Sequence, residues 1–413
     1  MTVDVEIQIN DSTNPRARFL TWAPSPCRIR VRNPAGITTP FVSLKISGRS
    51  TASGGAVQFR AGATGAFSDS ITLTVSASGN TAPFFSAGKF GRPSSSNGDV
   101  TIEARSGTTL VGSVPVMVRI RKNANTLSAP ERDRFLEALA KLNNQGTGRF
   151  SDFRDMHNAS ALGQAHGAPG FLPWHRAYLL DLERELQAID PSVALPYWRF
   201  DKAAPNIFKP DFMGSSDNLG TVQFNPGHPL TFWKTDTVPG IKRRPIPAFN
   251  VNLAPPGVID EAATLALGTQ YKQFRGMEGN PHGRAHTRFD AISFLSDAST
   301  APRDPLFFLL HCNVDRLWAQ WQKANSRFDQ AVAAAYDENP AFPVGHRLAD
   351  TLWPWNGVTS RVNPPSAPGG TLAPSPGVGA PGLQPRVRDM LDYRGVVSAA
   401  SRMGFDYDDV KFV

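Results

Sequence analysis

Six histidines, arranged in two groups of three, constrain this chain more than any other feature of its sequence. Along the chain they are His157, His166 and His175, then His282, His286 and His311. Neutral imidazole nitrogen is a good ligand for copper, zinc, iron and nickel. No glutamate precedes a histidine in the Glu-x-x-His spacing that a carboxylate-bridged di-iron site uses. This ligand set favours a pair of copper ions, with a tri-histidine zinc site as the alternative.

Two further histidines, His228 and His346, lie in Gly- and Pro-containing stretches and are interpreted as loop residues. The segment from His282 to His286 lacks the glutamate of a zinc-protease helix, so hydrolytic metal chemistry is not favoured.

The second group is predicted to lie on helices. His282 and His286 are four residues apart and therefore project from one helix face, after Asn280 as cap and Pro281 as first helical residue. Asp304-Pro305 predicts the start of another helix, which runs to about Asn325. One continuous stripe on it is formed by Phe307, His311, Val314, Trp318 and Trp321. The third histidine thus interrupts an apolar inward face.

The first group precedes or opens a third helix, predicted to begin at Pro173-Trp174 and to end before Pro191. His175 and three leucines lie along one side of this helix. Two helices from each half, with their histidines facing inward, predict a four-helix core around the metals.

Three longer stretches resemble the tyrosinase family of type 3 copper proteins. They are FLPWHRAYL at 171–179, LPYWR at 195–199 and DPLFFLLHCNVDRLW at 304–318. The resemblance covers residues 127–322, and Gly404–Asp408 is similar to the family's closing tyrosine motif. Where the family has two consecutive histidines, this chain has Leu310 followed by His311.

The resemblance implies that the first three histidines bind one copper ion and the second three bind the other, with O2 as co-substrate. The implied activity is oxidation of phenols, catechols or both to ortho-quinones, as in melanin formation. The expected substrate is a phenolic small molecule or a tyrosyl peptide. Phe307 matches the aromatic residue that packs beside the coppers in relatives.

Some positions near the proposed ligands differ from the family pattern, and one family residue could not be placed. Gly283 stands where many monophenol-hydroxylating members have an asparagine, and the family's companion glutamate has no assigned position here. A catechol oxidase or ortho-aminophenol oxidase without monophenol hydroxylation is therefore the alternative. Thr287 predicts a relatively open copper entrance. Gln164 replaces the cysteine that some relatives cross-link to a histidine, so no thioether is expected. An oxygen carrier and a protein with purely structural histidines are less favoured.

Residues 1–122 differ from the rest, because apolar residues alternate with mostly polar ones in short runs separated by Gly, Ser and Pro. This pattern predicts an immunoglobulin-like antiparallel β-sandwich with an accessory role. The expected fold is therefore multidomain, with a mainly α-helical copper domain at 123–345. Ser128–Glu131 is a capping box that opens its first helix. The alternating arginines of 28–32 predict a solvated sheet face.

Composition favours an enzyme without a nucleic-acid or membrane partner. The 413 residues are 40% apolar, and the net charge of +8 is not concentrated in a basic run. The two cysteines, Cys27 and Cys312, predict free thiols and a reducing compartment. No leader or membrane-spanning stretch is recognisable. Cytoplasmic localisation is expected, with export alongside a partner protein and homo-oligomerisation as open alternatives.

The C-terminal extension, 346–413, contains a stretch dominated by Pro, Gly, Ala and Ser. Such a segment predicts an extended, irregular linker. We hypothesise that residues 363–400 cover the mouth of the metal site, with an ordinary wrapped tail as the alternative.

Overall fold

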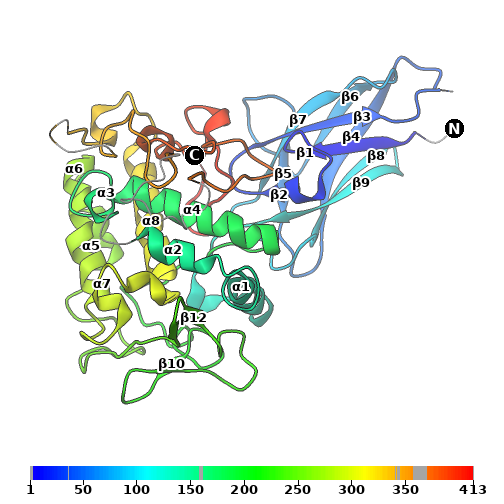
Figure 1. The fold of residues 1–413 in the computed structure, drawn as a ribbon. Helices are drawn as coiled ribbons and strands as arrows, with labels where there is room; N and C mark the ends of the chain where they lie inside the picture. The colour runs from blue at the N-terminus through cyan, green and yellow to red at the C-terminus, as the bar shows by residue number, and fades with distance from the viewer. Residues whose placement is uncertain are drawn as a thin grey trace. The chain divides into compact units, whose positions relative to one another are not determined.

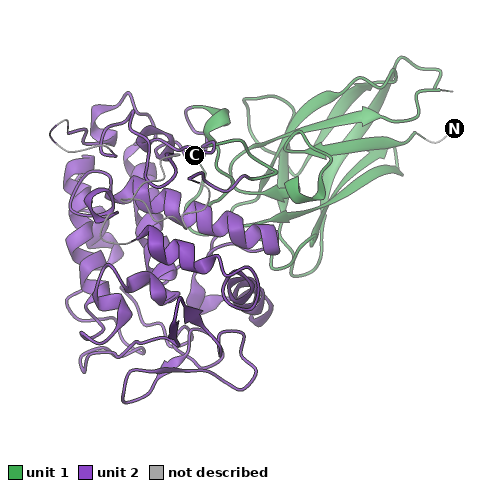
Figure 2. Ribbon diagram, in the orientation of Figure 1, with its two compact units in different colours: residues 1–120, 375–380, 398–413 green, residues 121–374, 381–397 purple. Residues whose placement is uncertain are grey.

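The computed structural model groups the chain into two compact units, which Figure 2 distinguishes by colour. Unit 1 comprises residues 1–120, 375–380 and 398–413, and unit 2 comprises residues 121–374 and 381–397. The chain beyond residue 345 is thus shared between both units. The structure describes residues 3–35, 37–157, 161–339, 341, 345–356 and 370–412.

Unit 1 is β-rich and contains two sheets (Figure 1). The four-stranded sheet has the order β1-β3-β7-β5, and the five-stranded sheet has the order β2-β9-β8-β4-β6. Paired strands are antiparallel except β2 and β9, which are parallel. The strands are β1 (Val5–Ile9), β2 (Phe19–Leu20), β3 (Ser25–Val31), β4 (Phe41–Ser50), β5 (Val57–Arg60), β6 (Ser70–Ser76), β7 (Ala82–Gly88), β8 (Val100–Ser106) and β9 (Thr109–Val118).

Alternation of buried and solvent-facing residues explains how these strands form one core. Ile29 and Phe84 of the first sheet and Leu44 and Ile102 of the second belong to a single cluster of buried side chains. Side chains on one face of a strand recur every second residue, so each alternating run supplies one face to this cluster. The alternating runs of the sequence correctly located β1, β3, β4, β6 and β9.

The arginines of β3 lie on the solvent-facing side of their sheet, as predicted. Arg28 pairs with Asp11 at 2.7 Å and Arg30 pairs with Glu6 at 2.9 Å. The arginine side chains are about half exposed in both pairs. These ion pairs therefore contribute little to the stability of the sheet.

Unit 2 is mainly helical, with two short hairpins, β10–β11 and β12–β13. Its two longest helices, α4 and α8, pack against each other. The helices are α1 (Ala129–Leu142), α2 (Phe150–Met156), α3 (Leu162–Ala165), α4 (Phe171–Ile189), α5 (Glu261–Leu265), α6 (Tyr271–Phe274), α7 (Arg284–His286) and α8 (Leu306–Asn325).

Local capping sets the starts of two of these helices where the sequence predicted them. The capping box of α1 is present, and Ser128 N donates to Glu131 Oε2 at 3.1 Å. Asp304 precedes α8, and its Oδ1 accepts from Leu306 N at 2.9 Å. Such contacts satisfy amide groups that have no partner within the helix. Helix α8 ends at Asn325 as expected, followed by Ser326 in the left-handed conformation.

One predicted helix start and one predicted capping bond were wrong in detail. Helix α4 begins at Phe171, so Pro173 is its third residue. The first turn tolerates proline because its missing N–H has no partner there anyway. Asn280 has the non-helical angles φ −148° and ψ 118°, and its Oδ1 accepts from Ile259 N at 3.0 Å. Asn280 therefore anchors a loop instead of capping the turn that carries His282.

A buried ion-pair network joins α4 to α8. Arg176 Nε donates to Asp315 Oδ1 at 2.6 Å, and Arg121 contacts Asp315 Oδ2 at 3.2 Å and Glu183 Oε2 at 2.8 Å. All four side chains are at most 2% exposed. Charges this deeply buried persist only when paired, so the network holds the two helices in one register.

Both cysteines are buried and neither forms a disulfide bond within the described residues, as predicted. In the described part of the chain, none of the helices has the combined length and apolar character needed to span a lipid bilayer.

Candidate metal centre

Unit 2 brings the predicted histidines together in their predicted groups. The ligand atoms within each group lie within 4.8 Å of one another. His175 and His311 project from the long helices α4 and α8, whereas the other four lie in or next to short helical segments. His157 follows α2, His166 follows α3, His282 lies in the turn Gly279–Gly283, and His286 ends α7.

Backbone carbonyl groups fix the orientation of four of the six rings. A carbonyl oxygen can only accept a hydrogen bond, so each bonded Nδ1 must carry the proton and each Nε2 must be bare. The contacts are His157 Nδ1 to Ala298 O at 2.8 Å, His175 Nδ1 to Phe171 O at 2.8 Å, His282 Nδ1 to Glu278 O at 2.7 Å, and His286 Nδ1 to Leu295 O at 2.7 Å.

The Nε2 atoms converge, and those of the rings whose Nδ1 is held by an acceptor carry no proton to share. His157 Nε2 lies 3.0 Å from His166 Nε2, and His311 Nε2 lies 3.3 Å from His282 Nε2 and 3.4 Å from His286 Nε2. Within the part of the chain that the structure describes, the buried Nε2 of His175 has no hydrogen-bond partner. Converging bare lone pairs are unfavourable when buried, and a cation between them supplies the missing partner. The described residues therefore fit two metal ions.

Burial keeps five of the six imidazoles neutral, which is the form that binds metals. Desolvation, reinforced by neighbouring histidines, lowers the pKa of His157 to about 3, and desolvation lowers the pKa of His286 to about 4. Burial also holds the pKa values of His175, His282 and His311 well below the usual range. At neutral pH the lone pairs of these rings are thus available without loss of a proton.

The two groups form one continuous cluster of rings. The His175 and His311 rings, one from each group, are stacked with centroids 4.1 Å apart and planes 8° from parallel. Phe307 is fully buried, and its ring centroid lies 4.3 Å from that of His311 and 4.9 Å from that of His157. Phe171 contacts both groups, at 4.9 Å from His175 and 5.0 Å from His282. Two metal ions held by these groups would therefore be neighbours.

Glu278 links the two groups and was not singled out from the sequence. Its Oε1 accepts from His166 Nδ1 at 3.2 Å and from Gly167 N at 2.6 Å, while its backbone oxygen accepts from His282 Nδ1 at 2.7 Å. A carboxylate bonded to the second nitrogen of a ligating histidine orients the ring and increases its basicity. The signal that was available is a glutamate one helical turn before His282.

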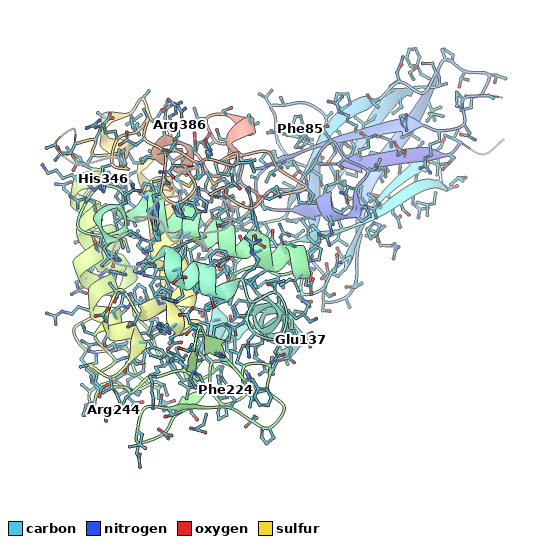
Figure 3. The ribbon with its side chains drawn as sticks, viewed as in Figure 1. Phe85, Glu137, Phe224, Arg244, His346 and Arg386 are labelled. Atoms are coloured by element: carbon cyan, nitrogen blue, oxygen red, sulfur yellow. The ribbon has the colours of Figure 1, made fainter. Side chains whose placement is uncertain are left out.

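His346, which Figure 3 labels and which was interpreted from the sequence as a loop residue, bonds to both sides of the segment that carries His166. It is fully buried, its Nε2 donates to Gly163 O at 2.7 Å, and its Nδ1 accepts from Gly170 N at 3.1 Å. These bonds hold both ends of the short segment around His166. No local pattern in the sequence signals this role, because the contacts are long-range.

Gly283 and Thr287 lie beside His282 and His286, respectively. A Cβ atom at Gly283 would meet one nearby atom, the backbone oxygen of Glu278, at 3.3 Å. The position is helical and almost open, so a larger side chain fits there with a small adjustment. Thr287 is exposed, and its Oγ1 bonds Arg284 O at 3.3 Å.

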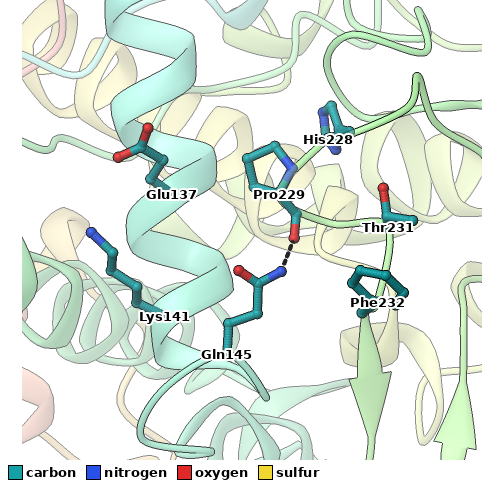
Figure 4. Close-up of a pocket in the computed structure, with 8 residues that line it drawn as sticks. Glu137, Lys141, Gln145, His228, Pro229, Thr231 and Phe232 are labelled. Carbon is teal, nitrogen blue, oxygen red and sulfur yellow. Dashed lines mark hydrogen bonds between the residues drawn. The ribbon is translucent and has the colours of Figure 1, made fainter.

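A separate surface hollow of about 450 Å³ lies between α1 and the loop around His228 (Figure 4). Gln145 Nε2 donates to Pro229 O across it, at 2.5 Å. His228 is buried and stacks on Phe224 with centroids 4.5 Å apart. The hollow is lined by neither group of three histidines.

Two adjacent groups of three histidines, held by helices and packed around buried aromatic rings, define a protein with a binuclear metal centre. The family model described as the common central domain of tyrosinase matches residues 147–324. The chain is 31% identical to the tyrosinase of Streptomyces antibioticus over 267 residues, which are 58% of this chain and 94% of that protein. It is also 31% identical to the tyrosinase of Streptomyces glaucescens over 264 residues, covering 57% of this chain and 92% of the relative.

The structure of deoxygenated haemocyanin from Rapana thomasiana is similar to 71% of this chain and 70% of the haemocyanin chain, with 22% identity and a TM-score of 0.48. The two Streptomyces relatives are matched over nearly their whole length, so the chain belongs to the tyrosinase family of type 3 copper proteins. It is a binuclear copper phenol oxidase that uses O2, as predicted.

Proposed function

We propose that this chain oxidises phenols and catechols to ortho-quinones at the six-histidine centre. In this proposal, one copper ion is held by His157, His166 and His175, and the other by His282, His286 and His311. The observation that carries the assignment is the convergence of bare Nε2 atoms, down to 3.0 Å between His157 and His166. When bound, copper supplies the redox chemistry, accepting electrons from the phenolic ring and passing them to O2.

The chain's own contribution is to fix the ligand geometry and to handle the phenolic proton. The carbonyl groups that hold Nδ1 of four rings keep each of those rings in one tautomer, so no proton has to leave these four ligands when metal binds. Phe307 and Phe171 exclude water from the space between the groups. Glu278 supplies the carboxylate nearest to this centre among the described contacts, through His166. We assign it the role of the companion glutamate, holding the proton that a monophenol loses.

Gly283 sets the balance between monophenols and catechols in this proposal. A monophenol must lose its hydroxyl proton before it is hydroxylated, and a polar side chain at position 283 would help to hold a water for this step. Glycine offers no such group, whereas the almost open Cβ direction accommodates one. We therefore expect slower turnover of the monophenol than of the matched catechol.

The test is oxygen uptake by the copper-loaded chain on a catechol and on its matched monophenol. We expect uptake on both, faster on the catechol, and a Gly283→Asn variant that gains selectively on the monophenol. A Thr287→Asn variant, also next to a proposed ligand but exposed, is the matched control and should not show this selective gain. No uptake on either substrate by a chain shown to hold two copper ions would contradict the proposed function.

The finer descriptions of the fold belong to the same proposal. We classify unit 1 as an immunoglobulin-like sandwich with an accessory role, supported by two sheets that share one core. The four-helix core is supported by α2, α4, α7 and α8, each of which carries or directly precedes a proposed ligand. Cytoplasmic localisation is supported by two cysteines that form no disulfide bond among the described residues. Self-association is a further proposal, to be tested by sedimentation.

Residues 363–400 are proposed to cover the metal site, and 363–369 of these lie outside the described residues. In the described part, Ala373 N donates to Asp181 at 2.7 Å, and Met390 O accepts from Arg176 at 2.6 Å. Deleting the whole tail would remove these buried contacts and destabilise unit 2. A chain that lacks residues 363–400, stays folded and oxidises catechol at an unchanged rate would contradict this proposal.

A further inference from the structure

We propose that the β-rich unit contains a second binding site, for a small aromatic carboxylate, in a pocket beside β5. The pocket has a volume of about 360 Å³, enough for one substituted ring, and is formed entirely within unit 1. Its lining combines aromatic rings with cationic and amide groups, notably Trp22, Gln58, Arg60, Phe67, Phe90 and Lys411.

Arg60 is the central group of this pocket. It lies on β5, two residues from Gln58, and both project from the face opposite the buried Val57 and Phe59. Its guanidinium carbon is 4.9 Å from the centroid of the Phe67 ring and 5.2 Å from that of Phe85, which Figure 3 labels. The planar cation is therefore held between two aromatic faces.

The strand pairing explains this placement. Phe85 of β7 is the direct cross-strand partner of Arg60. After β5 the chain turns back, and Phe59 pairs with Ser68 through two backbone hydrogen bonds of 2.8 and 2.9 Å. This return brings Phe67 over the strand that carries Arg60. The cation is thus positioned by regular sheet geometry on one side and by a short hairpin-like turn on the other.

Arg60 lacks the counter-ion that comparable arginines have. Among the residues that the structure describes, its guanidinium has neither an ion pair nor a hydrogen-bond partner, and its Nε is buried. Burial lowers its pKa, which is the direction expected for an uncompensated cation. By contrast, Arg28, Arg30, Arg49 and Arg105 on other strands of unit 1 each contact a carboxylate. A carboxylate is the group that the guanidinium fork binds best.

The opposite wall of the pocket is aromatic. The Trp22 and Phe90 rings meet edge to face, with centroids 5.6 Å apart. Trp22 is held by two bonds to the C-terminal segment, from Nε1 to Tyr407 O at 2.8 Å and from its backbone N to Asp406 Oδ2 at 3.1 Å. A Cβ atom at Gly88 would lie 2.9 Å from the Trp22 ring, so glycine is required there. Trp22 is only 2% exposed and supports Phe90, which is 38% exposed and offers the apolar surface to a flat ligand.

The combination of aromatic rings and the Arg60 cation favours an aromatic carboxylate over a neutral sugar. Aromatic walls alone would accept either ligand, but a neutral ligand would leave the Arg60 charge uncompensated. Lys411 adds a second cation to the lining. The ligand class is therefore a single aromatic ring with one carboxylate group, and this inference does not depend on the identity of the copper ligands.

Isothermal titration calorimetry on the copper-loaded full chain tests the proposal, with benzoate as the probe and benzyl alcohol and glucose as neutral comparisons. We expect a benzoate site that survives a His311→Ala substitution and loses at least roughly tenfold in affinity in Arg60→Gln. Arg49→Gln, an arginine variant on another strand of unit 1, should bind like the parent chain. Circular dichroism of each variant establishes that it is folded.

Three results would overturn the proposal. Benzoate binding that is unchanged in Arg60→Gln would place the ligand elsewhere. Equal affinity for benzoate and for either neutral probe would remove the role of the charge. No measurable benzoate binding by the folded parent chain would show that the pocket does not take this ligand class.

Discussion

Substitution of Asp315, which connects the helices that carry His175 and His311, should strongly lower the stability of unit 2. Asp315 lies one helical turn after His311, and it accepts a 2.6 Å hydrogen bond from Arg176, the residue after His175. The Asp315→Ala substitution leaves the buried Arg176 without a carboxylate partner. Breaking one side of a buried pair costs about 3–5 kcal/mol.

The lower end of this range applies to Asp315→Ala. Arg121 keeps Glu183 at 2.8 Å, and Arg176 keeps Gln322 Oε1 at 2.9 Å and Met390 O at 2.6 Å. We therefore expect a loss of about 3 kcal/mol in the free energy of unfolding. For a unit of this size, each kcal/mol shifts Tm by about 2–4 °C, so Tm should fall by about 6–12 °C.

Scanning calorimetry of the metal-free full chain measures this shift without a contribution from copper. Asp133→Ala is the matched control, since Asp133 also pairs with an arginine, at 2.9 Å, but its side chain is 52% exposed. An exposed pair contributes about 0–1 kcal/mol, so its Tm should change little. Equal shifts in the two variants would refute the argument that burial makes the Asp315 contact strong.

Three further predictions follow from the contacts around the histidines. Glu278→Gln should weaken copper binding at the group that contains His166 by roughly 10–100-fold. The other group should be spared, because its contact with residue 278 is through the backbone. Chelator competition measures both affinities, and equal weakening of both groups would contradict the prediction. His346→Phe should raise the amide exchange rate of Gly170, because that amide loses its acceptor, and unchanged protection in native-state hydrogen exchange would exclude the bracing role. Because burial lowers the pKa of His157 to about 3, the unfolded metal-free chain binds a proton below about pH 6.5 that the folded chain does not. The free energy of unfolding should therefore fall as pH decreases from about 6.5 towards 4, by about 1.4 kcal/mol per pH unit for this group. Denaturant unfolding of a His157→Gln variant should show a smaller change of this free energy per pH unit. An equal change in the variant and the parent chain would contradict the assignment.

The features predicted correctly from the sequence are those carried by local patterns. The 3.6-residue stripe through His311 predicted α8 to its last residue, because an apolar face with a cap at Asp304 leaves little freedom for a helix. The period of two predicted β1, β3 and β4 for the same reason. The histidine groups were predictable because metal ligands must be of a few residue types, and their spacing marks them.

The features missed depend on contacts between distant segments. β7 (Ala82–Gly88) contains Pro83 and adjacent phenylalanines, and its identity as a strand comes from pairing with β3 and β5. Asn280 carries a good capping side chain, yet a tertiary bond to Ile259 draws it elsewhere. Glu278 and His346 act on His166 across sequence separations that no periodic pattern encodes. The roles of these two residues follow only from the three-dimensional structure.

Copper content per chain tests the central claim most directly. The assignment predicts two copper ions in the parent chain and one in each double variant that removes a single group, His157→Ala with His175→Ala, or His282→Ala with His311→Ala. Metal analysis after removal of loosely bound ions gives these numbers without reference to activity. Two coppers retained by either double variant, or fewer than two in the folded parent chain loaded with excess copper, would contradict the six-histidine centre.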